Sequence, residues 1–547
     1  MVRLGRCWHL IAFLVIAMAP ALAAQDTAAV PAEAPQTWQE LREFQAGPTP
    51  YDTLMAFWTE LARARPEVTI QPVARTLMGR EVVLVVISSE PVHSPEDALR
   101  SGKAIVLIAN SVHGAETAGK EASQIVARDL LYGELRHVLD DVVVLFIPVL
   151  NPDGGELRRR TNEAGLDLNR DYIKLESQEI RGLVTRVLRV WTPDIHVDTH
   201  HGGASPYTLT WQGSLNPAVD AELRDFPYRH IFPRIRAALR AEDYEGFDYA
   251  GPQVVDWVPG WGTTSLEPRK HHTYAGLINS IAILLESPSG IRRLRNHGTI
   301  LDPVPAEERY RHQVRGQVIA QRTILEVAAE MRQEIRELTN GARRRAAAVS
   351  PEAPPIVLEY RTTSRGRDMV WVPDAMSVLG YRPDVRDIFL RREPTRTVPR
   401  PIGYVMPPAM TGVVPLLQAH GIAVYQFAEP VTLDLEIYHA VQVNQGDYIE
   451  GHYIRSVIVE RSEAEVAVPA GAYYVPMAQP RGNLIGYLME PETDENLITW
   501  GYADHILRVT PPSLADGNPL QRFQRQLVPM MRLVQEQPLP VTLVPAD

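Results

Sequence analysis

The fold of this chain is decided by residues 104–116, which read AIVLIANSVHGAE. A short, continuous apolar run such as 104–110 is typical of a strand that is buried on both faces of a sheet. The run leads to His113 and Glu116, and a helix-like stretch begins at Ala118. Because imidazole nitrogen and carboxylate oxygen both bind Zn²⁺, we expect two zinc ligands at the mouth of this strand.

A catalytic zinc ion requires a third protein ligand and an open fourth position. The apolar stretch 193–199 ends at His200, and two glycines follow the histidine pair. We expect His200 to be the third ligand because it lies where this strand ends. His196 would point to the same face of the strand, since it lies four residues earlier, and His201 is adjacent, so both remain alternatives.

Strand-like and helix-like segments alternate along the first two thirds of the chain. Strands are expected at 104–109, 142–149, 194–199 and 281–286, and helices at 118–133, 176–191, 217–241 and 307–345. This alternation predicts an α/β fold with a mixed, largely buried sheet and helices on both faces. Ligands of such sheets lie at the carboxyl ends of the strands, where Glu116, Asn151, His200 and Glu286 fall.

A chain of 547 residues is too long for one compact core, so two domains are expected. The segments are a signal peptide (1–24), an extended leader (25–48), a catalytic domain (49–345), a linker (346–355) and a smaller, mainly β C-terminal domain of unknown role (356–547). The last segment is rich in proline and in short apolar runs, which are typical of short strands.

The N-terminus has the three parts of a secretory signal peptide: a basic start at 1–6, an apolar run at 10–19 and small residues up to Ala24. The only cysteine, Cys7, lies within this segment, so the mature chain would hold no disulfide. A secreted chain without cysteine favours a bacterial periplasm. No later segment reaches the roughly 20 apolar residues that span a bilayer, so we expect no stable membrane insertion.

The chain is acidic, with a formal net charge of −11 at pH 7. Nucleic-acid partners require a basic face, so this charge balance argues against them. It does not restrict a small substrate, because one buried arginine can define an anionic subsite inside an acidic protein.

Further motifs follow the 113–116 pair in a fixed order. They are the turn Asn151-Pro152-Asp153-Gly154, Arg160, Asp167-Leu168-Asn169-Arg170, His200 and Glu286. In this order the residues resemble the zinc carboxypeptidase superfamily (peptidase family M14) over roughly residues 45–340, and the chain is similar to large secreted bacterial members with a C-terminal β-rich extension. The resemblance implies the zinc carboxypeptidase fold and one Zn²⁺ per chain, held by His113, Glu116 and His200.

The resemblance also implies catalytic roles. Glu286, at the end of an apolar strand, matches the glutamate that takes a proton from the zinc-bound water and passes it to the leaving amine. Arg160 matches the cation that stabilises the oxyanion, and its neighbour Arg159 is the alternative.

Three residues of the 167–170 motif match residues around the substrate. Asn169 and Arg170 match the pair that binds the terminal carboxylate, to which a planar guanidinium donates two parallel hydrogen bonds. Asp167 matches the residue that accepts a hydrogen bond from the first zinc histidine and orients its ring.

Three further residues of possible interest for the site lie close together at 271, 272 and 274. Tyr274 could match the mobile tyrosine of the digestive enzymes, but it precedes Glu286 more closely than in that pattern, so packing in the core is favoured. We expect His271 and His272 to be ordinary surface or loop histidines.

These motifs predict a zinc-dependent metallocarboxypeptidase that hydrolyses the C-terminal peptide bond, or a peptide-like amide bond, of a substrate with a free carboxylate. The expected substrate is a peptide or a peptidoglycan-derived peptide. A cell-wall stem-peptide hydrolase would be one form of this enzyme. One alternative is an N-acyl amino-acid deacylase of the aspartoacylase type, which shares the H-x-x-E and D-x-N-R elements. Another is a non-catalytic binding module on a peptidase scaffold. The sequence leaves the preferred C-terminal residue open.

Overall fold

The computed structural model describes residues 34–203, 205–295, 300–349, 353–376, 380–509, 525–535 and 542–546. The predicted signal peptide, with Cys7, and the first residues of the predicted leader lie outside these ranges. Within the described part of the chain, no helix is long and apolar enough to cross a membrane.

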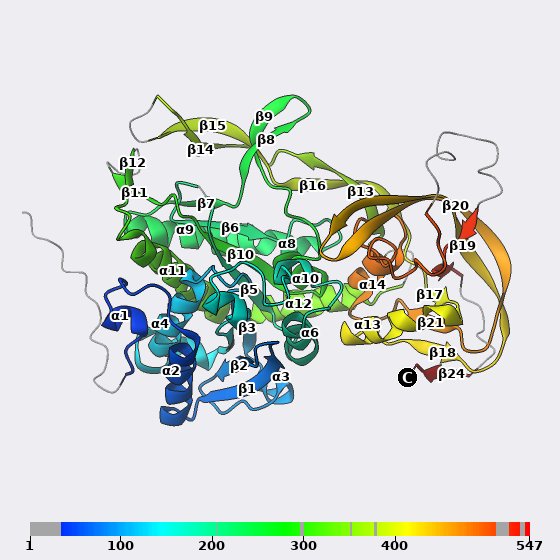
Figure 1. The fold of residues 1–547 in the computed structure, drawn as a ribbon, viewed down its shortest axis with the longest axis horizontal. Coiled ribbons are helices and arrows are strands. Elements are labelled where there is room, and N and C mark those ends of the chain that lie inside the picture. The colour runs from blue at the N-terminus through cyan, green and yellow to red at the C-terminus, as the bar shows by residue number, and fades with distance from the viewer. Residues whose placement is uncertain are drawn as a thin grey trace, which may run out of the picture.

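A mixed eight-stranded sheet forms the centre of the first two thirds of the chain (Figure 1). Its strands lie in the order β1 (Val68–Arg75), β2 (Glu81–Ile87), β4 (Val142–Ile147), β3 (Ala104–Asn110), β5 (Ile195–His201), β10 (Ile281–Ser287), β6 (Leu209–Gly213) and β7 (Gly246–Asp248). Strands β4, β3, β5 and β10 run parallel. Strand β1 pairs antiparallel with β2, β2 with β4 and β6 with β10, whereas β7 runs parallel to β6. The four predicted strands are therefore confirmed, and they are neighbours in the sheet.

Helices cover both faces of this sheet, as predicted. Side chains alternate along β5, so Thr199 points to one face and Asp198 to the other. Helix α4 (Ala118–Tyr132) packs on the Thr199 face and contacts α11 (Arg309–Glu330). Helix α10 (His271–Leu277) packs on the Asp198 face.

Three of the predicted long helices are interrupted. The stretch 176–191 forms α6 (Gln178–Leu183), a π turn (Val184–Leu188) and α7 (Arg189–Trp191). The stretch 217–241 forms α8 (Ala221–Phe226), a π turn (Pro227–Ile231) and α9 (Phe232–Ala241). Because Pro227 and Pro233 lack an N–H group, they cannot complete the α-helical hydrogen bonds of this second stretch. The stretch 307–345 divides at Met331 into α11 and α12 (Arg332–Ala346).

The remaining helices of this region lie outside the main β/α alternation. They are α1 (Trp38–Leu41), α2 (Tyr51–Ala64), α3 (Pro95–Ser101) and α5 (Pro152–Glu156). Short turns of 3-10 helix lie at Glu134–Asp140 and Leu168–Arg170.

The region beyond residue 356 is mainly β, as predicted. Its larger sheet contains β20 (His452–Val468), β19 (Val431–Ile449), β23 (Met531–Leu533), β17 (Gly403–Met406), β21 (Tyr473–Pro476), β18 (Tyr425–Phe427) and β24 (Leu543–Pro545), and β22 (Gln526–Leu527) pairs with β19. Helices α13 (Val414–Ala419) and α14 (Gly482–Met489) pack beside it. Figure 1 shows the long β19–β20 hairpin extending back toward the first region.

Two smaller sheets lie along the top of the molecule in the view of Figure 1. One pairs β13 (Ile356–Thr363) with β16 (Arg391–Val398), and the other has the order β14 (Arg367–Pro373), β15 (Tyr381–Phe389), β9 (Val258–Gly262) and β8 (Gly251–Val255). In the second sheet β15 pairs in parallel with β9, so backbone hydrogen bonds join the two regions. The remaining short strands, β11 (Arg292–Arg295) and β12 (Ile300–Pro303), form a hairpin.

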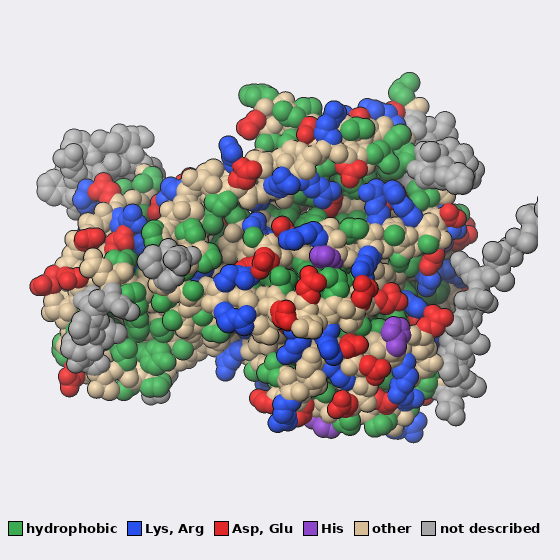
Figure 2. Space-filling view, turned by 180° about the vertical axis from the view of Figure 1, so that it is seen from behind, with side chains coloured by type: hydrophobic (Ala, Val, Ile, Leu, Met, Phe, Trp, Pro, Cys, Tyr) green, Lys and Arg blue, Asp and Glu red, His purple; other side chains and the backbone are tan. Residues whose placement is uncertain are grey.

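Charged side chains of both signs are interspersed on the face shown in Figure 2. This distribution differs from the continuous basic face that nucleic-acid binding requires.

Replacing Gly119 by alanine tests the close contact between α4 and β5. An added Cβ would overlap Thr199 Oγ1, and this clash should outweigh the helix-propensity gain of about 1 kcal/mol. We expect the free energy of unfolding in urea to fall by about 1–3 kcal/mol. Gly251→Ala is the matched control, because an added Cβ there meets nothing within 4 Å. Unchanged stability of Gly119→Ala would contradict this packing.

Candidate metal centre

The turn at Asn151 holds together the loops that follow β3 and β4. Asn151 Oδ1 accepts a hydrogen bond from the N–H of Gly154 (2.9 Å), and Asn151 Nδ2 donates to the carbonyl of Arg160 (3.2 Å). Gly114 lies so close to Gly154 that a Cβ at residue 114 would overlap its backbone. The turn and the glycine between His113 and Glu116 thus fix the position of the H-x-x-E element.

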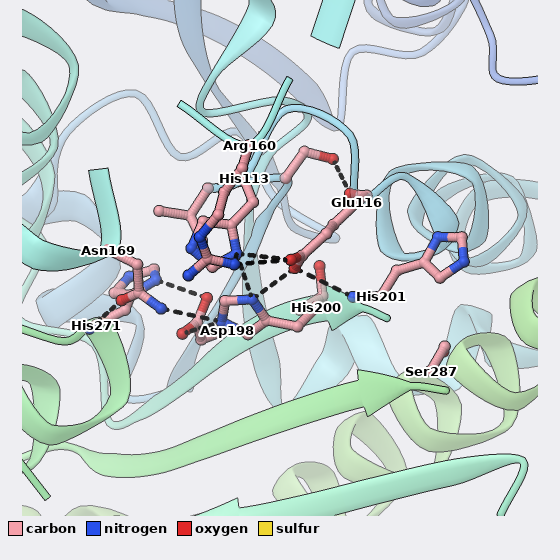
Figure 3. A network of polar contacts seen from close by, with 12 residues as sticks. His113, Glu116, Arg160, Asn169, Asp198, His200, His201, His271 and Ser287 are labelled. Carbon is pink, nitrogen blue, oxygen red and sulfur yellow. Dashed lines mark hydrogen bonds and ion pairs between the residues drawn. The ribbon is translucent and has the colours of Figure 1, made fainter. Parts of the chain in front are cut away.

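The three predicted ligands meet at the carboxyl ends of β3 and β5 (Figure 3). The ligand atoms of His113, Glu116 and His200 all lie within 4.8 Å of one another. One carboxylate oxygen of Glu116 lies 2.8 Å from His113 Nδ1, and the other lies 2.8 Å from His200 Nδ1. Both histidines are buried. Two nitrogens and one oxygen form a typical set of protein ligands for catalytic zinc.

The outer nitrogens of both histidines face carboxylates. His113 Nε2 lies 3.2 Å from Asp167 Oδ1, and His200 Nε2 lies 2.9 Å from Asp198 Oδ2. The two Nδ1 atoms meanwhile approach to 3.2 Å, an arrangement suited to a cation between them. A carboxylate behind each imidazole is the usual support of a zinc-binding histidine. The residues therefore fit a zinc ion.

Neither alternative third ligand reaches this cluster. His196 is buried beneath it, with its ring 4.4 Å from the ring of His271. His201 points to the opposite face of β5 and stacks on Tyr310 at 6.0 Å. The geometry therefore favours His200.

The expectation that His271 and His272 are surface histidines is wrong. Both are buried in α10, and burial lowers the pKa of His272 to about 3. His271 Nδ1 lies 2.9 Å from Asp198 Oδ1, so Asp198 lies between His271 and the predicted ligand His200. The sequence did not show this, because α10 has only seven residues and no clear periodicity.

Glu286 lies beside the cluster because of strand register. Strands β10 and β5 run parallel with Glu286 opposite His200. Burial raises the pKa of Glu286 to about 8, and its carboxylate forms no ion pair with any residue in the described part of the chain. A carboxyl group in this position can exchange a proton near neutral pH.

Arg160, and not Arg159, reaches the cluster. The Arg160 guanidinium donates to Asp167 Oδ2 through Nε (2.9 Å) and to Glu116 Oε1 through Nη1 (3.3 Å). Its side chain remains 47% exposed, so a substrate can reach it. Arg159 lies 3.9 Å from Glu163 instead.

Asn169 and Arg170 lie on the turn beside His200. Asn169 Oδ1 accepts a hydrogen bond from the N–H of His271 (2.8 Å), and its Nδ2 lies 3.4 Å from His200 Nε2. Arg170 is half-buried, and among the described residues no carboxylate pairs with its guanidinium. Its charge is therefore available to an anionic ligand.

Tyr274 does not lie at the centre, and another tyrosine, Tyr249, lies near it. Tyr274 is buried, and its hydroxyl lies 2.8 Å from His420 Nδ1, so it packs in the core. Tyr249, directly after β7, lies close enough to the centre that the charge of Glu286 adds to burial in raising its pKa. It is 36% exposed. No motif around Tyr249 marked it in the sequence.

The chain is similar to several known proteins. Residues 54–206 match the family described as zinc carboxypeptidase (peptidase M14). Carboxypeptidase 2 of Trichophyton tonsurans is 23% identical over 497 residues, which cover 88% of this chain and 87% of that protein. Probable carboxypeptidase 2 of Arthroderma benhamiae is 24% identical over 485 residues, with 83% and 85% covered.

Among solved structures, a metallo-carboxypeptidase from Burkholderia cenocepacia matches with a TM-score of 0.40 and 17% identity, over 52% of this chain and 70% of that one. The family match over residues 54–206 and the sequence relatives indicate a hydrolase that acts on peptide bonds. The two sequence relatives are fungal, so the bacterial origin stays a prediction.

Asp198→Asn tests the support behind His200. The amide keeps the shape of the side chain but removes the negative charge that orients the imidazole, so zinc affinity should fall about 10–100-fold. A competition titration with a chromophoric chelator measures this affinity. Asp141→Asn is the control, because that carboxylate is 40% exposed and pairs with Arg332 far from the centre. Equal affinities of both variants would show that Asp198 does not support the ligand.

Proposed function

We propose that this peptide-bond hydrolase is a zinc metallocarboxypeptidase, with His113, Glu116 and His200 as metal ligands and Glu286 as the general base. The observation that carries the proposal is the convergence of the three ligand side chains within 4.8 Å, with Glu286 opposite His200 on the adjacent strand. When bound, zinc would act as a Lewis acid toward the scissile carbonyl and would lower the pKa of water.

The side chains around the metal site would divide the remaining chemistry. Glu286 would accept a proton from the attacking water and return it to the leaving amine, which its raised pKa permits near neutral pH. Arg160 would stabilise the negative charge that develops on the carbonyl oxygen, since its guanidinium is fixed by Asp167 and half exposed. Tyr249 would border the substrate near Glu286.

The substrate would be held by its free C-terminal carboxylate. Arg170 supports this assignment because its guanidinium has no ion-pair partner among the described residues and lies next to Asn169, which contacts His200. A planar guanidinium matches a carboxylate with two parallel hydrogen bonds. This end-group contact would restrict cleavage to the last peptide bond.

The substrate class that we propose is a peptide, including peptidoglycan-derived peptides with a free carboxylate. The predicted signal peptide supports action outside the cytoplasm, and a bacterial periplasm is the proposed location.

Peptide cleavage by the zinc-loaded protein and by Glu286→Gln tests the function. We expect the wild type to release single C-terminal residues, as seen by mass spectrometry of a mixed peptide pool. Glu286→Gln should bind zinc normally but lose at least 10²-fold in kcat, because a proton acceptor is absent. A chelator should abolish cleavage, and zinc should restore it.

Glu429→Gln, a change of the same kind at an exposed glutamate, is the control and should keep full activity. Internal cuts would replace the proposal with an endopeptidase. Release of acyl groups from capped amino acids, without peptide cleavage, would indicate a deacylase of the aspartoacylase type. Full activity of Glu286→Gln would remove Glu286 from the mechanism.

Arg170→Lys tests recognition of the terminal carboxylate. Lysine keeps the charge but cannot donate two parallel hydrogen bonds, so we expect kcat/KM for free-acid peptides to fall about 10–100-fold, mainly through KM. Peptides with an amidated C-terminus should be poor substrates of both proteins. Arg186→Lys, at an exposed position, is the control. Equal cleavage of acid and amide forms by the wild type would contradict this role of Arg170.

A further inference from the structure

The tip of the β19–β20 hairpin contacts the turn that carries the carboxylate-binding pair. Strands β19 and β20 are joined by the two residues Glu450 and Gly451. Glu450 Oε2 accepts a hydrogen bond from the backbone N–H of Asp167 (3.3 Å). Because Asp167 lies two residues before Asn169 and three before Arg170, a carboxylate from the last quarter of the chain borders the proposed substrate site.

The backbone of the tip is unusual for a glutamate. Glu450 has φ 48° and Gly451 has φ 85°, the two positive values of a tight hairpin turn. Asparagine, aspartate or glycine is the common residue at the first position, and glutamate adopts this conformation at a cost. A residue that is strained in this way is often retained for the function of its side chain.

Several contacts fix the tip to the first region and to the segment after α14. His452 Nε2 lies 2.7 Å from Glu176 Oε1, and the His452 ring meets the Trp500 ring edge to face at 5.8 Å. Arg455 forms an ion pair with Asp504 (2.8 Å), and its N–H donates to the carbonyl of Thr499 (3.0 Å). The carboxylate of Glu450 is thus placed by a rigid support.

The same support reaches the start of α10. Trp500 Nε1 donates to Glu495 (3.0 Å), whose carboxylate pairs with Arg269 at 3.0 Å. The Lys174 ammonium also lies over the Trp500 ring at 4.5 Å. The hairpin tip and the turn at 167–170 therefore belong to one packed unit.

The charge of Glu450 is not neutralised by this packing. Among the residues that the structure describes, no lysine, arginine or histidine forms an ion pair with its carboxylate, whereas Glu176, Glu267 and Glu495 nearby each have a cationic partner. An unpaired carboxylate beside Asn169 and Arg170 attracts cations and repels anions over a distance of about one Debye length, roughly 8–10 Å.

We propose that the hairpin tip is a wall of the subsite for the leaving C-terminal residue, and that Glu450 makes this subsite favour a cationic side chain over an acidic one. The inference rests on the proposed carboxypeptidase function. If Arg170 holds the terminal carboxylate, the side chain of the same residue must lie near the 167–170 turn, where Glu450 supplies a negative charge.

The test compares peptides that differ only in the last residue, lysine or glutamate, with the full-length mature zinc-loaded protein. We expect the wild type to have a higher kcat/KM for the lysine peptide. Glu450→Gln keeps an oxygen that can accept from the Asp167 N–H but removes the charge, so the lysine-to-glutamate ratio should fall about three- to tenfold, mainly through KM. The effect should shrink at high salt.

Glu463→Gln is the matched control, because it removes the same charge from an exposed position of β20 far from the tip. An unchanged ratio in Glu450→Gln, an equal loss for both peptides, or a wild type without preference for lysine would each overturn the inference while leaving the carboxypeptidase function intact. A wild type that releases no terminal residue would overturn the proposed function and the inference with it.

Discussion

The parallel alignment of β3, β5 and β10 is the constraint on which the rest of the site depends. Asn110 lies opposite Thr199, and Glu286 lies opposite His200, so the three strands end at the same level. A polar residue at the end of any of these strands, or a few residues after it, therefore lies at the same carboxyl edge of the sheet. The core supplies this alignment, because both faces of the sheet are covered and a slip of one residue would turn every side chain to the wrong face.

A second layer of polar residues converts this shared edge into a defined site. Asp167 contacts His113 and accepts a hydrogen bond from Arg160. Asp198 contacts His200 and lies against His271. Buried carboxylates of this kind are tolerated only when their charge is compensated. The contact with Asp198 therefore accounts for the buried position of His271 at the start of α10.

The sequence predicted the parts of the fold that depend on local pattern. The strand at 104–109, its helix and the H-x-x-E element between them could be read directly, because apolar runs and ligand spacing are local properties. His271, Tyr249 and Glu450 could not be found in this way. Tertiary packing of a short helix brings His271 against Asp198, a loop carries Tyr249, and a distant hairpin brings Glu450 to the backbone N–H of Asp167. The sequence next to these three residues does not predict these positions. That His200 is the third zinc ligand remains a prediction, and the geometry of the three histidines favours it over His196 and His201.

The pairing of β15 with β9 has a consequence for any attempt to separate the two regions. Strand β9 contributes to a sheet whose other half, β14 and β15, begins only at Arg367. A chain shortened to its first 345 residues would leave β9 with a bare edge of unpaired N–H and C=O groups. Such an edge pairs readily with other strands, so a chain cut at residue 345 would tend to self-associate, and β15 is the strand that covers this edge in the full chain.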